Sequence, residues 1–297
     1  MILLTGSNGF FGKHIYKEMI KFAAIDTLNR SNSTYNVNLA DTSLKITRKY
    51  DLVIHCAGKA HMVPTTEKQR TDFFEVNVKG SRNLLKALEN SSTLPQSFVY
   101  ISSVAVYGVD NGKDINEEHP LNATDAYGRS KIEAEILIQE WCAKNNVTCS
   151  VLRLPLVAGP HPPGNLGAMI KGQQKGYYFN INGGQAKKSI VMADDVAKII
   201  PTAAKIGGIY NLTDGYHPSF FEISKVIAKQ LGKPVPYSLP LFIASALGKC
   251  GDIIGSKAPI NSKKIHKIIS DLTFDDRKAR EMLKWSPQLV LEAFQIK

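Results

Sequence analysis

A loop with three regularly spaced glycines follows the first apolar run of the chain and restricts the folds open to it. Ile2 to Leu4 is expected to form a short buried strand, residues 6 to 12 form the loop, and a helical pattern follows. Gly6 permits a tight turn, Gly9 lets a pyrophosphate approach the backbone, and Gly12 lets the helix pack on the sheet. The alternative is a plain strand-to-helix turn. The loop predicts a dinucleotide site whose candidates are Gly6, Asn8, Gly9, Phe10, Phe11 and Gly12.

The end of the second expected strand bears on the choice of cofactor. This strand lies within Ile25 to Leu28 and ends in Asn29-Arg30. A carboxylate about 20 residues beyond the glycines normally holds the ribose hydroxyls of NAD, whereas an arginine accommodates the 2′-phosphate of NADP. We therefore expect NAD or NADP, with a lean towards NADP, although Arg30 also suits a solvated loop. Asn38 and Leu39 are expected in a strand end and loop near the adenine.

Three further apolar runs predict a buried parallel sheet. They span Asp51 to Gly58, Ser97 to Ile101 and Val147 to Leu154. Continuous apolar runs suit strands that are covered on both faces. The second run leads into Ser102-Ser103, at the edge where open α/β sheets bind ligands. The first run ends in small residues that leave room for a cofactor there: Cys56, Ala57 and Gly58.

A predicted helix from Phe73 to Leu88 carries a polar residue on its apolar face. Phe73, Asn77, Leu84 and Leu88 fall along one stripe. Burying an amide without partners is costly, so Asn77 is expected to have a dedicated hydrogen-bonding role. Gly80, on the same side, indicates a close approach of another backbone.

Tyr127 and Lys131 lie four residues apart in a predicted helix from Tyr127 to Trp141, so they share a helix face. The helix is expected to place Ile132, Ile136 and Leu137 along its apolar side. A nearby cation favours the tyrosine anion and would lower its pKa, which suits a general base or acid. The alternative is an interfacial tyrosine beside an exposed lysine.

Composition narrows the function classes. The formal net charge is +11, which favours an anionic partner. The lysines are scattered without basic blocks, so we expect no nucleic-acid binding. The four cysteines form no Cys-x-x-Cys pair, so neither a metal site nor a disulfide framework is indicated. Leu241 to Leu247 is apolar but too short to span a membrane, and we expect a packed helix there. With no signal peptide visible, a cytoplasmic location is expected.

Taken together, these motifs resemble those of the extended short-chain dehydrogenase/reductases, in particular the NAD(P)-dependent nucleotide-sugar epimerase/dehydratase family. The resemblance covers most of the chain and weakens after about Leu212. The matching segments are residues 5–12, 53–58, 77–81, 102–108, 127–131 and 189–197.

The resemblance implies a role for each of five residues. Tyr127 matches the proton-transfer residue, and Lys131 matches its partner, which also bonds the nicotinamide ribose. Ser103 matches the hydroxyl that positions the reacting sugar oxygen, with Ser102 as the fallback. Asn77 matches a buried asparagine that supports the site. A further cofactor contact near the nicotinamide falls on Pro155.

The substrate residues are expected beyond the strand ends. Lys59 follows Gly58, and Asn165 begins a predicted helix, residues 165 to 178, in the region where the family enters its sugar-nucleotide lobe. Lys188 is the favoured cation for a substrate diphosphate, although Lys187 and Lys188 also read as an ordinary exposed pair.

The chain departs from the family pattern at three places that bear on function. Val104-Ala105 replaces the Asp-Glu pair of dehydratases, Asn29 replaces the usual acid, and Leu156 replaces an asparagine. The resemblance implies a 4-epimerase of a nucleotide sugar, expected to be a UDP-sugar, acting through a 4-keto intermediate. An NADPH-dependent reductase of a 4-keto nucleotide sugar is the alternative, and a non-catalytic NAD(P)-sensing protein is a third reading.

We predict an α/β fold, with a Rossmann-like doubly wound parallel sheet and a smaller discontinuous substrate lobe. Residues 1–155 and 188–212 are expected to bind the cofactor, and residues 156–187 and 213–297 the nucleotide sugar. A homodimer stays open.

Overall fold

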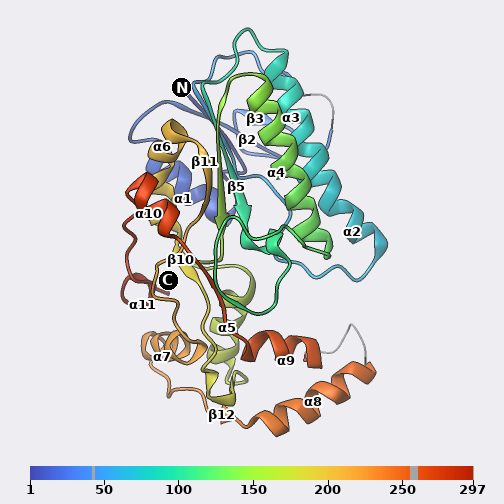
Figure 1. Ribbon diagram of the computed structural model, residues 1–297, viewed down its shortest axis with the longest axis vertical. Coiled ribbons are helices and arrows are strands. Elements are labelled where there is room, and N and C mark those ends of the chain that lie inside the picture. The colour runs from blue at the N-terminus through green and yellow to red at the C-terminus, as the bar shows by residue number, and fades with distance from the viewer. Residues whose placement is uncertain (42–43, 255–259, 297) are drawn as a thin grey trace.

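The computed structural model describes residues 1–41, 44–254 and 260–296, and it is built around a parallel sheet (Figure 1). The seven strands of this sheet follow the order β11-β7-β5-β4-β1-β2-β3, and all adjacent pairs are parallel. The order reverses direction between β1 and β4, which is where doubly wound sheets bind ligands. The predicted fold class is confirmed. The strands are β1 (Ile2–Thr5), β2 (Ile25–Asn29), β3 (Tyr35–Asn36), β4 (Leu52–His55), β5 (Ser97–Ser103), β7 (Thr148–Leu154) and β11 (Gly208–Asn211).

Helices cover both faces of the sheet, which explains why its strands read as continuous apolar runs. One layer holds α1 (Phe10–Met19), α6 (Ala193–Ile206) and α10 (Arg277–Leu283). The other layer holds α2 (Glu67–Phe74), α3 (Gly80–Glu89) and α4 (Ala126–Lys144) (Figure 1). The apolar core therefore lies in two slabs, one on each side of the sheet.

The segment after β2 matches the expected strand end and loop, because the strand ends at Asn36, and Asn38 and Leu39 lie in the loop beyond it. The helix predicted from Phe73 to Leu88 is interrupted by a π-helical turn, η1 (Glu75–Lys79), between α2 and α3. Such turns often occur at functional sites, and this one carries Asn77.

Helix α4 starts and ends outside its predicted limits and buries a different face. Asp125 caps it, because its Oδ1 accepts hydrogen bonds from the N–H groups of Tyr127 and Gly128, both 3.1 Å long. Ile132 and Leu137 are half-buried against the core, but Ile136 is 46% exposed, so the predicted apolar side was wrong at Ile136. The buried face instead mixes apolar and polar residues, which disguises it in the sequence; it consists of Gly128, Ser130, Lys131, Ala134, Glu135, Ile138, Trp141 and Cys142.

A second group of elements lies beyond the carboxyl edge of the sheet (Figure 1). It contains α5 (Gly164–Lys175), β9 (Asn180–Ile181), η3 (Asn182–Gly184), α7 (Phe220–Gln230), β12 (Ser238–Leu239), α8 (Leu241–Ile254) and α9 (Ser262–Ile269). Short parallel pairs link β8 (Leu156–Ala158) with β10 (Ile190–Met192) and β6 (Gly112–Ile115) with β13 (Leu272–Phe274). Helix α10 packs back against α6, and α11 (Val290–Ala293) contacts α7. The division of the chain into two lobes stays a prediction.

Candidate active site

A cavity of about 1560 Å³ lies between the carboxyl edge of the sheet and the second group of elements. Its walls come from the glycine loop, the ends of β2, β4, β5 and β7, and the starts of α4 and α5. Asn77 is buried behind the wall. The cavity is lined by all the other residues predicted for the site: Gly6, Asn8, Gly9, Phe10, Phe11, Gly12, Asn29, Arg30, Asn38, Leu39, Cys56, Ala57, Gly58, Lys59, Ser103, Tyr127, Lys131, Pro155, Asn165 and Lys188.

The glycine loop has the shape that a dinucleotide requires. Gly6 has φ +77°, and a Cβ there would lie 2.7 Å from the Ala57 Cα. A Cβ on Gly12 would lie 2.0 Å from the Gly6 carbonyl oxygen, so α1 sits directly on the loop. A Cβ on Gly9 would meet only that carbonyl oxygen, at 3.3 Å, and otherwise face the cavity. Side chains thus stay clear of the backbone where a pyrophosphate would bind.

Asn29 and Arg30 occupy different surroundings at the end of β2. The Asn29 amide is buried, donates to the Ser7 hydroxyl at 2.7 Å and accepts from the Asn8 N–H at 3.3 Å. Its side chain therefore fixes the glycine loop. Arg30 is exposed at the rim of the cavity, where no carboxylate of β2 accompanies it.

Asn77 has the dedicated bonding role predicted for it. Its side chain is 1% exposed, and its Oδ1 accepts from the Lys59 N–H at 2.7 Å. Its Nδ2 donates to the Lys59 carbonyl at 3.1 Å and to the Ser130 hydroxyl at 2.9 Å. The amide therefore joins the loop after β4 to helix α4, which carries Tyr127 and Lys131.

A buried histidine that sequence reasoning missed extends this network. The Ala57 N–H donates to Thr5 Oγ1 at 3.1 Å, and Thr5 Oγ1 lies 2.7 Å from His55 Nδ1. His55 Nε2 lies 2.9 Å from Ser81 Oγ, which donates to the Asn77 carbonyl at 2.6 Å. Burial lowers the pKa of His55 to about 3, so the ring is neutral. Ser81 uses its proton on Asn77, so His55 Nε2 donates and Nδ1 accepts. The sequence signal that could have revealed this histidine is its position as a polar residue at the end of an apolar strand.

Ser103 and Tyr127 meet at the cavity wall. Burial raises the pKa of Tyr127 more than the Ser103 hydroxyl lowers it, so the pKa lies above its usual value. The expectation that Lys131 would lower the tyrosine pKa is not met in this structure. Desolvation of the phenolate outweighs the favourable interactions here.

Lys131 is buried directly behind the pair. Its ammonium donates to the Tyr100 hydroxyl at 3.1 Å and to the Ile101 carbonyl at 2.8 Å. Burial lowers its pKa to about 8. The reading of an exposed surface lysine is therefore wrong, since Lys131 is 6% exposed.

Ser102 faces a buried ion pair that the sequence gave no reason to expect. Its hydroxyl donates to Glu135 Oε1 at 2.5 Å, and Glu135 Oε2 accepts from Arg153 Nη2 at 2.7 Å. Glu135 is fully buried and Arg153 is 2% exposed. Ser103, whose hydroxyl accepts from the Ala105 N–H at 3.2 Å and contacts Tyr127, remains the hydroxyl we propose for the site.

The predicted substrate residues Lys59 and Lys188 line the cavity. The Lys59 ammonium pairs with Asp72 at 2.6 Å. Lys188 is 8% exposed, and its ammonium donates to the carbonyls of Lys267 and Ser270 at 2.9 and 2.8 Å. Burial lowers the pKa of Lys188 to about 8. The reading of Lys188 as an exposed surface lysine is therefore wrong.

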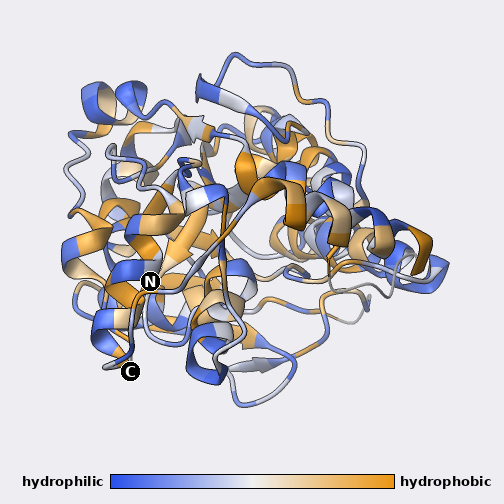
Figure 2. Cartoon of the chain, turned by 90° about the horizontal axis from the view of Figure 1, so that it is seen from below, coloured by the Kyte–Doolittle hydropathy of each residue, from blue (hydrophilic) through white to orange (hydrophobic). Residues whose placement is uncertain are grey.

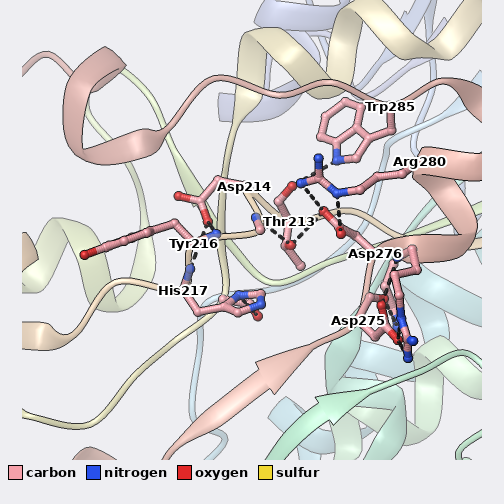
Figure 3. Close-up of polar contacts among 12 residues, drawn as sticks. Thr213, Asp214, Tyr216, His217, Asp275, Asp276, Arg280 and Trp285 are labelled. Carbon is pink, nitrogen blue, oxygen red and sulfur yellow. Dashed lines mark hydrogen bonds and ion pairs between the residues drawn. The ribbon is translucent and has the colours of Figure 1, made fainter.

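A second cavity, of about 650 Å³, lies near α10 and is lined by charges that pair with one another (Figure 3). Arg280 Nε donates to Asp276 Oδ1 at 2.8 Å, and Asp276 Oδ2 accepts from Thr213 at 3.0 Å. The Trp285 indole donates to the Thr213 carbonyl at 2.9 Å. These bonds attach the C-terminal segment to the end of β11.

Comparisons with known proteins agree with this arrangement. The model of the NAD dependent epimerase/dehydratase family matches residues 2–212. The N-acetyl-alpha-D-glucosaminyl-diphospho-ditrans,octacis-undecaprenol 4-epimerase of Escherichia coli O157:H7 is 26% identical over 93% of this chain and 88% of its own. The UDP-glucose 4-epimerase of Vibrio cholerae is 26% identical over 98% of this chain and 92% of its own.

Solved structures show the same fold. A UDP-glucose 4-epimerase of Thermotoga maritima, solved with UDP-glucose, superimposes with a TM-score of 0.75 at 20% identity, covering 98% of this chain and 94% of that one. RMD from Pseudomonas aeruginosa, complexed with NADPH, gives a TM-score of 0.72 at 20% identity, with 98% and 94% covered. The chain belongs to the NAD dependent epimerase/dehydratase family and is an NAD(P)-dependent enzyme of the short-chain dehydrogenase/reductase type.

Proposed function

We propose that this enzyme is a 4-epimerase whose substrate is a sugar joined to a diphosphate carrier. The sequence predicts that this substrate is a UDP-sugar. The relatives support a substrate that carries a sugar on a diphosphate, because one relative is named for UDP-glucose and another for a sugar on diphospho-undecaprenol. Both substrates present a sugar and a diphosphate. Lys188 and Lys59, on the cavity wall, are the cations proposed for the diphosphate.

The observation that carries the proposal is that Ser103 and Tyr127 line the cavity together, close enough for the serine to affect the tyrosine pKa, beside Val104 and Ala105. The pair offers a proton acceptor and a hydroxyl that can hold a sugar oxygen. The two residues that follow Ser103 in the cavity wall have apolar side chains, so neither supplies the acid or base for eliminating water. Epimerisation at a single carbon requires only the proton acceptor and the hydroxyl that Tyr127 and Ser103 provide.

In the proposed mechanism, the Tyr127 phenolate takes the proton of the sugar C4 hydroxyl, and Ser103 donates a hydrogen bond to the oxygen as its charge changes. The Lys131 ammonium stabilises negative charge developing beside it. A dinucleotide held by the glycine loop and the strand ends would supply the acceptor, and later the donor, of hydride. The sugar turns over as its 4-keto form, and Tyr127 returns the proton to the oxygen.

A reductase of a 4-keto sugar is the second candidate. It is favoured by Arg30 at the cavity rim and by the absence of a carboxylate at Asn29, because both suit the 2′-phosphate of NADPH. It would use the same Tyr127, but the sugar would leave after a single hydride transfer.

The test is turnover of a panel of UDP-sugars by the wild type and by Tyr127→Phe. Sugar conversion without net change of nicotinamide absorbance indicates the epimerase, whereas net NADPH consumption with a 4-keto sugar indicates the reductase. Removing the phenol hydroxyl should lower kcat by about 10²–10⁴-fold with cofactor affinity retained. Full activity of Tyr127→Phe would refute the role of Tyr127.

A further inference from the structure

Helix α8 has one side of small residues and one side of large apolar residues, and it buries the side of small residues. Its buried residues are Ala244, Gly248 and Gly251. A Cβ on Gly248 would lie 2.5 Å from Ile265 Cδ1, so these small residues let α8 pack closely on α9. The prediction of a packed helix for Leu241 to Leu247 holds for this side and for half-buried Leu241, but the other large apolar residues of α8 are exposed.

The large apolar residues of α8 form one exposed stripe. At about 100° per residue they fall within an arc of about 140°. Phe242 is 75% exposed, Ile253 88% and Ile254 66%. The positions in this arc, which we call the α8 stripe, are Phe242, Ile243, Ala246, Leu247, Cys250, Ile253 and Ile254. A soluble helix normally turns such residues to the core, so a contiguous exposed set marks an interaction surface.

The charges around the α8 stripe are mostly positive. Lys249 on α8 and Lys264 on α9 are exposed, whereas Lys263 lies on the cavity side of α9. The acidic residue among the described parts of these helices, Asp252, accepts hydrogen bonds from the Ser262 N–H and hydroxyl. An apolar stripe bordered by lysines is the pattern of a helix that lies in the surface of an anionic bilayer.

A second copy of the chain fits this surface less well. Two α8 stripes meeting about a twofold axis would bring like-charged lysines together, and Asp252, the acidic residue among the described parts of these two helices, offsets only part of that charge. Anionic lipid headgroups would neutralise the same lysines.

Helix α8 is too short to span a membrane, because its 14 residues make a helix of about 21 Å. No helix in the described residues is long and apolar enough to cross a membrane.

Helix α9 connects this surface to the active-site cavity. Ile265 on one side of α9 packs on α8, while Lys263, Lys267 and Ile268 line the cavity. Lys188, the cation proposed for the diphosphate, donates to the Lys267 carbonyl. The diphosphate end of the cavity is therefore one helix away from the α8 stripe, at the end of the molecule that faces the viewer in Figure 2.

We propose that α8 docks this enzyme on an anionic lipid surface, so that a sugar diphosphate anchored in that surface by a polyprenyl chain enters the cavity past α9. The docking surface is independent of the reaction. The reaction at the sugar rests on the proposed function, whereas the polyprenyl diphosphate proposed here replaces the UDP predicted from the sequence.

Docking is tested by co-sedimentation of the full chain with vesicles of phosphatidylcholine, with and without phosphatidylglycerol. The wild type should bind the anionic vesicles, and less so as salt is raised. The double variant Phe242→Ser/Ile253→Ser should lose about tenfold or more of this binding. Ile20→Ser/Phe22→Ser removes two exposed apolar residues near the end of α1 and should change nothing.

Three outcomes overturn docking. The first is a wild type that stays in the supernatant, and the second is equal vesicle binding by the wild type and the Phe242/Ile253 variant. The third is a wild-type dimer that this variant dissociates in sedimentation velocity without any vesicle binding, which would assign the α8 stripe to a second copy.

The carrier is tested with one sugar on undecaprenyl diphosphate, presented in the anionic vesicles or in detergent micelles. The Phe242/Ile253 variant should turn over the vesicle-bound substrate about tenfold more slowly than the wild type and the micellar substrate equally fast. Equal rates in vesicles, or wild-type activity with the UDP-sugar alone, would overturn the lipid carrier. If the wild type binds vesicles but converts no substrate on either carrier, the proposed reaction fails and the docking surface is upheld.

Discussion

Single buried polar groups hold the active site together, and Asn77 is the clearest case. Its amide bonds both the loop after β4 and helix α4, so one side chain sets the distance between cofactor-side and catalytic residues. The stripe pattern predicted that this amide is buried with partners. Which partners it finds depends on elements that are far apart in sequence.

We expect Asn77→Ala to destabilise the protein by about 1–3 kcal/mol, because it leaves the Lys59 N–H and the Ser130 hydroxyl without their buried partner. It should also lower kcat, since α4 loses its link to the loop. Urea unfolding and turnover measure the two effects. Asn90→Ala, at the exposed end of α3, is the control. Stability equal to that control would contradict the role.

Burial of Lys188 makes stability depend on pH. Its pKa is about 8 in the folded chain against 10.5 ordinarily, so between these values the unfolded chain binds a proton that the folded chain lacks. The cost of burying the ammonium is fully present below pH 8 and is relieved as pH rises towards 10.5. As pH rises from about 8 to 10.5, the free energy of unfolding of the wild type should therefore increase relative to that of Lys188→Met.

Urea midpoints of both proteins across the window measure the gain. Lys187→Met, at the exposed neighbour, controls for loss of a lysine. A wild-type advantage that stays constant with pH would show that Lys188 is not desolvated.

At the scale of elements, the glycines in the turn between β1 and α1 have different roles. Gly12 has no room for a Cβ because the Gly6 carbonyl lies 2.0 Å from that position, whereas Gly9 faces the cavity. The sequence motif predicted both roles. The structure adds that the first concerns folding and the second concerns the ligand.

Two alanine substitutions separate these roles. Gly12→Ala should destabilise the fold, because α1 must move off the loop, and we expect a loss of about 1–3 kcal/mol. Gly9→Ala should keep most of its stability but bind NAD(P)H more weakly, since its Cβ enters the phosphate path. Thermal melts and cofactor fluorescence provide the readouts. The reverse pattern would contradict the assignment.

At the scale of the whole molecule, the cavity joins the sheet edge to the second group of elements, so a bound cofactor should stabilise the fold. At a cofactor concentration of 100 times Kd the expected gain is about 2.7 kcal/mol. Thermal shifts with NADH and with NADPH measure it. Arg30→Ala should reduce the NADPH shift and spare the NADH shift, and equal losses for both would remove the case for NADP.

The sequence by itself determined the parts of this protein that depend on local chemistry. The glycine spacing predicted the β1–α1 turn, the apolar runs predicted buried parallel strands, and the Tyr127–Lys131 spacing predicted one helix face. These follow from short-range geometry, because backbone conformation and side-chain periodicity are set within a few residues.

The tertiary structure decided what depends on neighbours from elsewhere in the chain. The face that α4 buries was misread, because Glu135 and Lys131 are polar in the sequence yet find partners on β7 and β5. The pKa of Tyr127 rises because other elements exclude water from it. The apolar residues of α8 looked like core, but only packing showed that its glycine side faces inward and that the large residues remain outside. Burial belongs to the assembled fold, so the sequence pattern predicts it only where one face of an element is plainly apolar.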